Sequence, residues 1–187
     1  MDSPSQWTSQ EIELIANCRV FEVHRHRMRR QSDSRMGEFY VLHAVDWVMA
    51  LPLTPDNGLV LVKQFRFGTS NFSWEVPGGM VDPGEEPVET AVRELREETG
   101  YVGINPRLIG TASPNPAILN NRCHFVRIDG CELTQNTSPD ENEEIETRIV
   151  SLEEAENWIA AGKIHHVIAI AAIFSLMQSL KSGPSAR

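Results

Sequence analysis

The sequence is poor in cysteine and in positive charge, and each shortage argues against certain classes of protein. It has three cysteines in 187 residues, at positions 18, 123 and 131. An odd count without a CxxC pair argues against a disulfide framework or a zinc site, so free thiols in a reducing compartment are expected. Lys and Arg number 17 against 26 Asp and Glu, a net charge of −9. A general DNA or RNA binder needs the opposite balance and is disfavoured.

Signals for membrane insertion and for secretion are also missing. The longest apolar stretch, residues 167–177, is too short to cross a bilayer and is expected to form a core helix. Residues 1–5 are polar, so no signal peptide is expected there and the protein is expected to be cytoplasmic. The sequence contains no G-x-S-x-G motif, P-loop or Rossmann fingerprint.

The remaining composition is that of a globular protein, with 41% hydrophobic residues in a length suited to one domain with a small appendage. Residues 1 to about 15 are polar and then weakly helical, and no element is assigned to them. Periodicity predicts strands at 19–28, 38–53 (one long strand or two), 59–65, 107–112, 123–128 and 145–150. Residues 74–79 are expected to form a short strand that runs into a Gly-rich bend. Helices are predicted at 86–99, 151–161 and 165–180.

This order predicts an α+β fold, an α/β/α sandwich with a mixed sheet, preceded by an N-terminal antiparallel β extension. We divide the chain into an N-terminal segment (1–17), the β extension (18–43), the main domain (44–180) and a flexible tail (181–187). The extension is a candidate for forming a dimer.

Three glutamates within one turn of the predicted helix 86–99 are the main chemical signal. Glu94, Glu97 and Glu98 share a face, since residues three and four apart are neighbours on a helix. Their mutual repulsion is relieved by a divalent cation, and carboxylate oxygens suit Mg²⁺ or Mn²⁺. The alternative is a solvated acidic face with Arg93 and Arg96 as ion-pair partners.

The segment 79–101 favours the cation, because it fits the pattern G-x5-E-x7-R-E-U-x-E-E-x-G-U, in which U is aliphatic. The matching residues are Gly79, Glu85, Arg93, Glu94, Leu95, Glu97, Glu98 and Gly100. This pattern resembles the Nudix box, the signature of the Nudix hydrolases. The one departure is Tyr101, which stands where an aliphatic residue is usual.

The resemblance implies a loop-helix-loop site that binds a divalent metal and cleaves a pyrophosphate bond. By position, Glu94 and Glu98 look like the main metal ligands, Glu97 like a ligand of a further ion, and the Gly78 carbonyl like the backbone ligand. Glu85 and Arg93 look like a pair that holds the loop against the helix. Gly79 and Gly100 take the structural glycine positions of the box.

Further segments resemble the branch of ADP-ribose and nucleoside-diphosphate-sugar pyrophosphatases. They are residues 75–79, an acidic loop at 138–146, residues 150–155 and residues 162–164. On its own the acidic loop would be a solvated surface loop. The resemblance makes Glu141 the first candidate for the general base and Glu143 the second, with Glu97 as a third carboxylate of the catalytic set.

Substrate contacts are predicted from the same branch. Arg66 in Lys63-Gln64-Phe65-Arg66 looks like a diphosphate contact, with a surface ion pair as the alternative. Glu75 belongs to the resembling segment and is counted with the substrate-binding residues. Pro114 and Asn115 occupy the loop where the branch often has Ser-Pro-Gly. Because asparagine replaces that glycine, other nucleoside-diphosphate sugars fit as well as ADP-ribose.

The predicted reaction therefore releases a nucleoside monophosphate and a sugar phosphate from a small nucleotide-sugar substrate, with Mg²⁺ or Mn²⁺ as cofactor. Alternatives are another nucleotide substrate (GDP-mannose, a dinucleotide, capped RNA or a nucleoside triphosphate) or a non-catalytic nucleotide-sensing module. Neither a nucleic acid nor a membrane is expected as a partner. The chain is expected to form a homodimer through its N-terminal strands. The arginines at 25, 27, 29 and 30 are expected on a polar strand face, and Phe21, Phe39, Tyr40 or Trp47 are candidates for stacking on a nucleobase.

Overall fold

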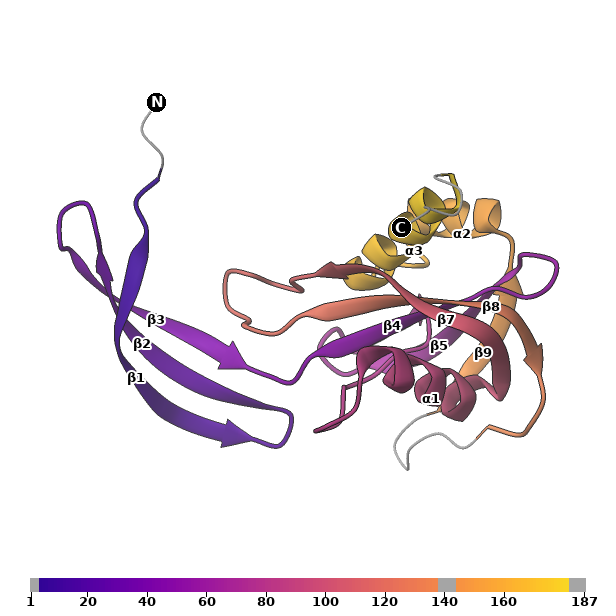
Figure 1. Ribbon diagram of the computed structural model, residues 1–187, viewed down its shortest axis with the longest axis horizontal. Helices are drawn as coiled ribbons and strands as arrows, with labels where there is room; N and C mark the ends of the chain where they lie inside the picture. The colour runs from indigo at the N-terminus through magenta and orange to yellow at the C-terminus, as the bar shows by residue number, and fades with distance from the viewer. Residues whose placement is uncertain (1–3, 138–143, 182–187) are drawn as a thin grey trace. The chain divides into compact units, whose positions relative to one another are not determined.

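A computed structural model of the chain describes residues 4–137 and 144–181. The described residues fall into two compact units (Figure 1). One lies within Met1–Val45 and Ser113–Arg122, and the other within Asp46–Ala112 and Cys123–Arg187. We call them the N-terminal unit and the larger unit.

Three antiparallel strands form the sheet of the N-terminal unit, in the order β1-β2-β3. They are β1 (Trp7–Cys18), β2 (Phe21–Arg30) and β3 (Met36–His43). The predicted antiparallel extension is confirmed, but residues 7–15, to which the sequence assigned no element and only weak helical character, belong to β1. The register of β1 shifts between Ser9 and Glu11 and again between Leu14 and Ala16. Each shift interrupts the period-two pattern that would reveal a strand in the sequence.

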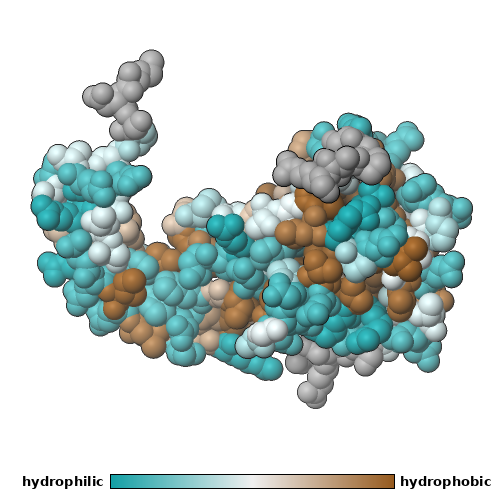
Figure 2. All heavy atoms as spheres, viewed as in Figure 1, coloured by the Kyte–Doolittle hydropathy of each residue, from teal (hydrophilic) through white to brown (hydrophobic). Residues whose placement is uncertain are grey.

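One face of this sheet carries partly exposed apolar side chains beside a histidine group, in which the His24 and His43 rings stack and His26 Nε2 lies 3.1 Å from His43 Nε2. Ile12, His26 and Phe39 lie in one cross-strand row, so their side chains share a face. Leu14 lies two residues further along β1 on the same face, and the Phe39 ring meets that of Trp7 edge-on with 5.3 Å between centroids. Ile12, Leu14 and Phe39 are 52%, 50% and 42% exposed. Figure 2 shows apolar residues of this unit among hydrophilic ones.

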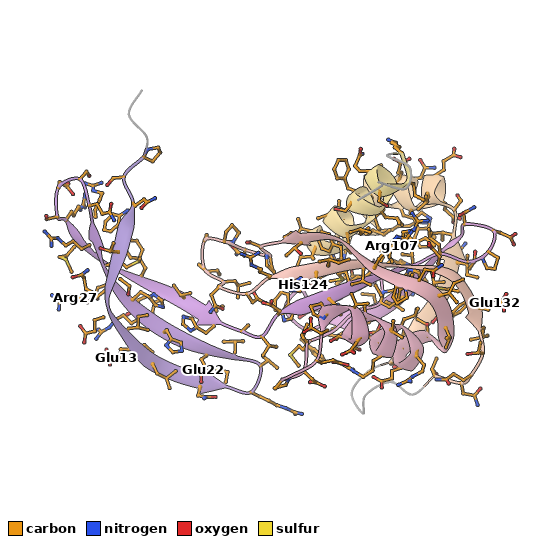
Figure 3. All side chains as sticks on the ribbon, viewed as in Figure 1. Glu13, Glu22, Arg27, Arg107, His124 and Glu132 are labelled. Carbon is orange, nitrogen blue, oxygen red and sulfur yellow. The ribbon has the colours of Figure 1, made fainter. Side chains whose placement is uncertain are left out.

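The other face is charged and internally paired. Arg25 on β2 forms a salt bridge with Glu13 on β1, and Arg27 Nη1 lies 3.9 Å from Glu11 Oε2. Glu13 and Arg27 can be located in Figure 3. Arg25 and Arg27 therefore lie on the polar strand face that the sequence predicts. Arg30, predicted on the same face, instead lies over the Trp7 ring on the opposite face, 5.6 Å from its centroid.

The second segment of the N-terminal unit, residues 113–122, packs with β3 although it follows β7 in the chain. Leu42 on β3 forms a bridge with Leu119, and its N–H donates to the carbonyl of Ile118 at 2.7 Å. The Ala44 N–H donates to Asn120 Oδ1 at 3.1 Å. Nothing in the sequence indicates this pairing, because it joins residues more than seventy positions apart.

Among the described residues, the larger unit contains two three-stranded sheets and three helices. Its strands are β4 (Trp47–Pro52), β5 (Leu59–Arg66), β6 (Asn71–Glu75), β7 (Tyr101–Ala112), β8 (Cys123–Leu133) and β9 (Glu146–Val150). Its helices are α1 (Pro87–Thr99), α2 (Leu152–Ala160) and α3 (Val167–Lys181). One sheet has the order β4-β8-β7, with β4 parallel to β8 and β7 antiparallel to it, and the other is an antiparallel β6-β5-β9 sheet.

Alternation along β4 separates the core of the larger unit into two layers. Val48 and Ala50 pack with Leu95 of α1, whereas Met49 and Leu51 belong to the cluster that contains α3. Side chains of a strand point alternately to its two faces, so α1 and α3 cover opposite faces of the β4-β8-β7 sheet. The predicted α+β sandwich with a mixed sheet is confirmed.

Most predicted elements of the larger unit are present, with shifted ends. The stretch 38–53 forms two strands rather than one, and β7 and β8 are longer than predicted. Ser151 caps α2 by accepting a hydrogen bond from the Glu154 N–H. His165 and His166, predicted inside the last helix, precede it, because α3 begins at Val167. Within the described residues, no helix has both the length and the apolar character that crossing a bilayer requires.

Candidate functional site

The helix α1 has clear start and stop signals. Pro87 occupies its first turn, where a missing N–H costs nothing, and the Glu86 N–H donates to the Glu89 carboxylate at 3.3 Å. Gly100 ends the helix in the left-handed conformation (φ 73°), and its N–H donates to the Arg96 carbonyl. These signals fix which residues of the segment fall on each face of α1.

The three predicted ligand residues of α1 differ in their exposure. Ala91 and Leu95 are buried and hold the helix against the sheet. Glu98 is buried as well, at 2% exposure, while the side chains of Glu94 and Glu97 are 15% and 35% exposed. The carboxylates therefore occupy a border between core and solvent, where their interactions are less screened than on an open surface.

Two glycines before α1 receive the carboxylates of Glu94 and Glu98. The Gly78 N–H donates to Glu98 Oε2 at 3.2 Å. A Cβ added at Gly79 would lie 2.3 Å from Glu94 Oε1, and one added at Gly78 would lie 2.2 Å from the Val48 carbonyl oxygen. Only residues without side chains allow this approach, so the glycine pair brings the loop backbone next to both carboxylates.

Arg93 holds the same region together from α1. Its Nε and Nη2 donate to the two Glu85 carboxylate oxygens at 3.1 and 3.0 Å. Its Nη1 donates to Glu94 Oε1 at 2.8 Å and to Glu97 Oε2 at 3.1 Å. The hydrogen bond between Arg93 and Glu85 raises the pKa of the Arg93 guanidinium, and it lowers the pKa of the Glu85 carboxyl group. Arg93 thus ties the loop residue Glu85 to the carboxylates of α1.

This donor set fits a hard divalent cation. It offers carboxylate oxygens beside a glycine backbone that a single Cβ would obstruct, and oxygen donors are what Mg²⁺ and Mn²⁺ prefer. Across residues 4–137 and 144–181, no three Asp, Glu, His or Cys side chains are already gathered as a cation site. Arg93 instead engages Glu94 and Glu97. Water and substrate oxygens would therefore complete the coordination of an ion at this site.

A second charged group links β5, β6 and the start of α3. Glu75 is fully buried, and Arg66 Nε and Nη2 donate to its two oxygens at 2.9 and 2.7 Å. His166 Nδ1 lies 2.6 Å from Glu75 Oε2. Burial alone would raise the pKa of Glu75, but the hydrogen bonds from Arg66 and His166 outweigh it and lower the pKa to about 2. Arg66, predicted as a diphosphate contact, is thus held by a buried anion.

The sequence did not point to His166. The chain separation from Glu75 is 91 residues, and the neighbouring His165 shows no spacing typical of a functional pair. The sequence offered no signal for it, because the predicted helix 165–180 included His166, whereas α3 begins at Val167.

A comparison with protein families now decides where the chain belongs. The profile of the NUDIX domain matches residues 44–169, which contain α1, both glycines and Arg93. This chain belongs to the NUDIX domain family. Residues 79–101 are accordingly its Nudix box.

Two curated relatives of this NUDIX chain are similar over part of their length. A CMP-5'-(N-acetyl-N-hydroxy-3-aminopropyl)phosphonate hydrolase of Streptomyces rubellomurinus is 36% identical over 106 residues, covering 56% of this chain and 50% of that protein. An ADP-ribose pyrophosphatase of Bacillus subtilis is 32% identical over 119 residues, covering 63% of this chain and 64% of that protein. The chain thus spans half to just under two thirds of the length of these relatives.

A solved structure resembles this NUDIX chain along its whole length. The crystal structure of an ADP compounds hydrolase superposes with a TM-score of 0.84 and covers 100% of both chains. The sequence identity is 21%, so this likeness shows the fold alone.

The remaining predicted site residues of the NUDIX chain lie outside the box. Pro114 and Asn115 belong to the N-terminal unit, where the Asn115 carbonyl accepts hydrogen bonds from Ile118 and Leu119 and so shapes a turn. Glu141 and Glu143, the candidates for the general base, lie outside the described residues.

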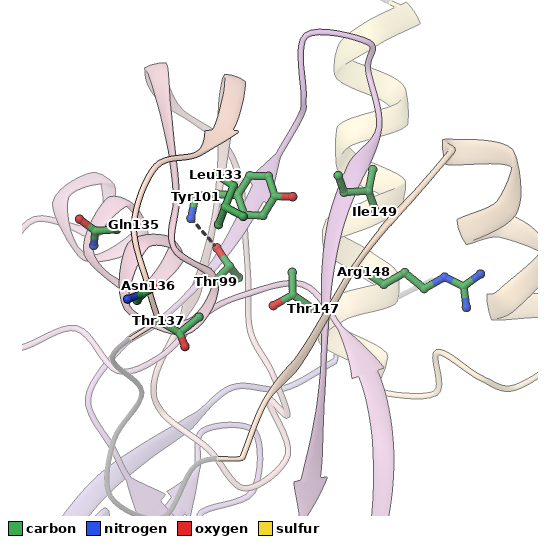
Figure 4. A pocket seen from close by; sticks show the side chains of 9 residues that line it. All are labelled: Thr99, Tyr101, Leu133, Gln135, Asn136, Thr137, Thr147, Arg148 and Ile149. Atoms are coloured by element: carbon green, nitrogen blue, oxygen red, sulfur yellow. Dashed lines mark hydrogen bonds between the residues drawn. The ribbon is translucent and has the colours of Figure 1, made fainter.

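A pocket of about 740 Å³ opens beyond the end of α1 (Figure 4). It is lined by Thr99, Tyr101, Leu133, Gln135, Asn136, Thr137, Thr147, Arg148 and Ile149. None of the box carboxylates is among these residues. The cation in its lining, Arg148, lies 3.6 Å from Glu154 and over the Trp158 ring. The pocket is therefore distinct from the carboxylate face of the Nudix box.

Proposed function

We propose that the chain hydrolyses the pyrophosphate bond of a nucleoside-diphosphate sugar such as ADP-ribose, in the presence of Mg²⁺ or Mn²⁺. The products are a nucleoside monophosphate and a sugar phosphate. The observation that carries the proposal is the seating of Glu94 and Glu98 against Gly79 and Gly78 within the Nudix box. The name of the Bacillus subtilis relative supports ADP-ribose as a substrate.

In this proposal Glu94, Glu98 and the Gly78 carbonyl hold the cation, and Glu97 helps to hold a further ion. When bound, the cation neutralises the diphosphate and lowers the pKa of a bound water. The chain's own contribution is to keep these oxygens oriented. Arg93 does so by donating to Glu94 and Glu97 from a guanidinium anchored on Glu85.

Arg66 is proposed to contact the diphosphate. Its side chain is 40% exposed although its partner Glu75 is fully buried. The guanidinium plane is therefore fixed at its buried end, and a planar fork matches the oxygens of a phosphate. Glu75 acts on the substrate through Arg66 in this proposal.

A carboxylate apart from the metal ligands must take the proton from the attacking water. Glu141 remains the first candidate for this base and Glu143 the second, and both rest on the family resemblance. Glu141→Gln with intact metal binding and strongly reduced turnover would identify the base, and the same result in Glu143→Gln alone would move the assignment.

The substrate range is best measured with a panel of ADP-ribose, GDP-mannose, UDP-glucose, NADH and diadenosine polyphosphates, compared by kcat/KM. The Streptomyces relative, named for a CMP conjugate, makes a cytidine compound a useful addition. We expect the nucleoside-diphosphate sugars to give the highest values. Pro114 and Asn115 remain proposed substrate-binding residues on the basis of the family resemblance.

Replacing a metal ligand tests the proposed reaction directly. Glu98→Gln and Glu94→Gln keep the shape of the side chain and remove its charge, so turnover with Mg²⁺ should fall by roughly two to four orders of magnitude. Glu156→Gln, an exposed glutamate on α2, is the matched control and should keep the wild-type rate. Near-normal turnover in either box variant would show that the metal assignment is wrong.

We also propose a cytoplasmic homodimer, in which the N-terminal strands form the extension and residues 44–180 the catalytic domain. The exposed apolar row at Ile12 and Phe39 supports a second copy as the partner. The three cysteines, which all lie among the described residues, are free.

A further inference from the structure

The carboxylate of Glu75 is the centre of a buried three-residue group. It is fully buried at the end of β6, and each oxygen accepts a hydrogen bond from Arg66. Oε2 also has His166 Nδ1 at 2.6 Å. An ionised carboxylate only accepts hydrogen bonds, so Nδ1 must carry the proton and donate it.

The backbone around His166 is fixed at both sides. The Trp74 N–H donates to the Lys163 carbonyl at 3.4 Å, and the fully buried Ile164 anchors the segment in the core. On the other side, the His166 carbonyl accepts the Ile170 N–H in the first turn of α3. The imidazole therefore reaches Glu75 from a rigid position.

The third contact has a physical consequence for Arg66. Each donor to a buried carboxylate matters, because a hydrogen bond left unmade in a low-dielectric site is costly. The hydrogen bond from His166 Nδ1 to Oε2 restricts rotation of the Glu75 carboxylate about the Cγ–Cδ bond. The plane of the carboxylate in turn sets the plane of the Arg66 guanidinium, because the two form a bidentate pair.

We propose that His166 is a positioning residue for substrate binding: it orients Glu75, and through Glu75 it aims the Arg66 guanidinium at an anionic diphosphate. This inference rests on the proposed function, because Arg66 is the diphosphate contact only there. His166 itself touches no substrate in this arrangement.

Two closely matched variants test the proposal. In His166→Asn the side-chain amide nitrogen takes the place of Nδ1, whereas in His166→Gln it takes the place of Nε2, which faces away from Glu75. Affinity for ADP-ribose is measured by calorimetry with EDTA present, so that no turnover occurs. We expect His166→Gln to weaken binding by about tenfold and His166→Asn to stay within about threefold of the wild type.

A double-mutant cycle separates positioning from a general loss of structure. In an Arg66→Ala background, His166→Gln should weaken binding no further, because the group it orients is gone. With Mg²⁺ present, KM should rise in the single variant while kcat changes less than about threefold. Melting temperatures of all variants are recorded alongside.

Equal affinity of wild type and His166→Gln, equal losses in His166→Gln and His166→Asn, or an undiminished loss in the Arg66→Ala background would each overturn the positioning role. Failure of the proposed function looks different: the wild type would bind ADP-ribose with the predicted His166 dependence but cleave no nucleoside-diphosphate sugar.

Discussion

Gly79 lies where any larger residue meets Glu94. The three heavy atoms nearest an added Cβ at this position all belong to the Glu94 carboxylate, with Oε1 at 2.3 Å. We therefore expect Gly79→Ala to fold normally, since a flexible side chain can move, and to lose about a hundredfold in kcat, since a ligand displaced by about 1 Å is costly. Steady-state kinetics and thermal melting check both points.

The matched control for this change is Gly68→Ala, because a Cβ there meets nothing within 4 Å. It should leave both the rate and the melting temperature unchanged. A Gly79→Ala protein that melts early would show that the glycine serves the fold rather than the site.

The thiols of Cys18, Cys123 and Cys131 are expected to differ in reactivity. Burial raises the pKa of Cys123 and of Cys131 to about 12, whereas Cys18 is exposed. The thiolate is the reactive form, so iodoacetamide at pH 8 should label Cys18 alone in the native protein and all three cysteines after unfolding. Peptide mass spectrometry reads the sites, and rapid native labelling of Cys123 would contradict the packing of β8.

At the scale of elements, the link between β5, β6 and the start of α3 makes stability depend on pH. The pKa of Glu75 is about 2 in the folded chain against an ordinary value of 4.5. A carboxyl group whose pKa is lower in the folded chain than in the unfolded chain stabilises the fold. This stabilisation is fully present above the pKa of the unfolded chain and is lost as the pH falls toward the pKa of the folded chain. The contribution near neutral pH is at most roughly 3 kcal/mol, and less where water reaches the half-exposed Arg66.

Urea unfolding at several pH values checks this contribution. Between about pH 5 and pH 2 the free energy of unfolding should fall more steeply in the wild type than in Glu75→Gln, which has no proton to gain. Parallel curves for the two proteins would mean that the buried carboxylate is not the titrating group.

At the scale of the whole molecule, the exposed apolar side chains on one face of the N-terminal sheet predict self-association. Ile12→Glu places a charge in the exposed row beside His26 and Phe39, and should shift the protein from dimer to monomer, because burying an unpaired carboxylate in an interface is unfavourable. Light scattering coupled to size-exclusion chromatography measures the mass.

Met36→Glu is the control for the dimer, since Met36 is also exposed, at 44% against 52% for Ile12, but pairs with Arg29 on the other face of the sheet. It should leave the mass unchanged. A wild type that elutes as a monomer at micromolar concentration would refute the dimer.

Sequence alone determined the Nudix box and most elements of the larger unit, because these depend on local spacing. Glu94, Glu97 and Glu98 share a helix face for geometrical reasons, and Pro87 and Gly100 mark the ends of that helix wherever it packs. The strand β1 was not predicted from the sequence, because two register shifts interrupt the alternation of its side chains.

Only the tertiary structure decided what depends on residues distant in the chain. It placed His166 against Glu75, seated Glu94 against Gly79, and packed residues 113–122 with β3. Such contacts arise when helices and strands fold onto one another, and neither composition nor periodicity records which pairs will meet. The candidate metal ligands could therefore be predicted from the order of the residues. The orientation of the Arg66 guanidinium could not, because it depends on how the chain packs around the buried Glu75 carboxylate.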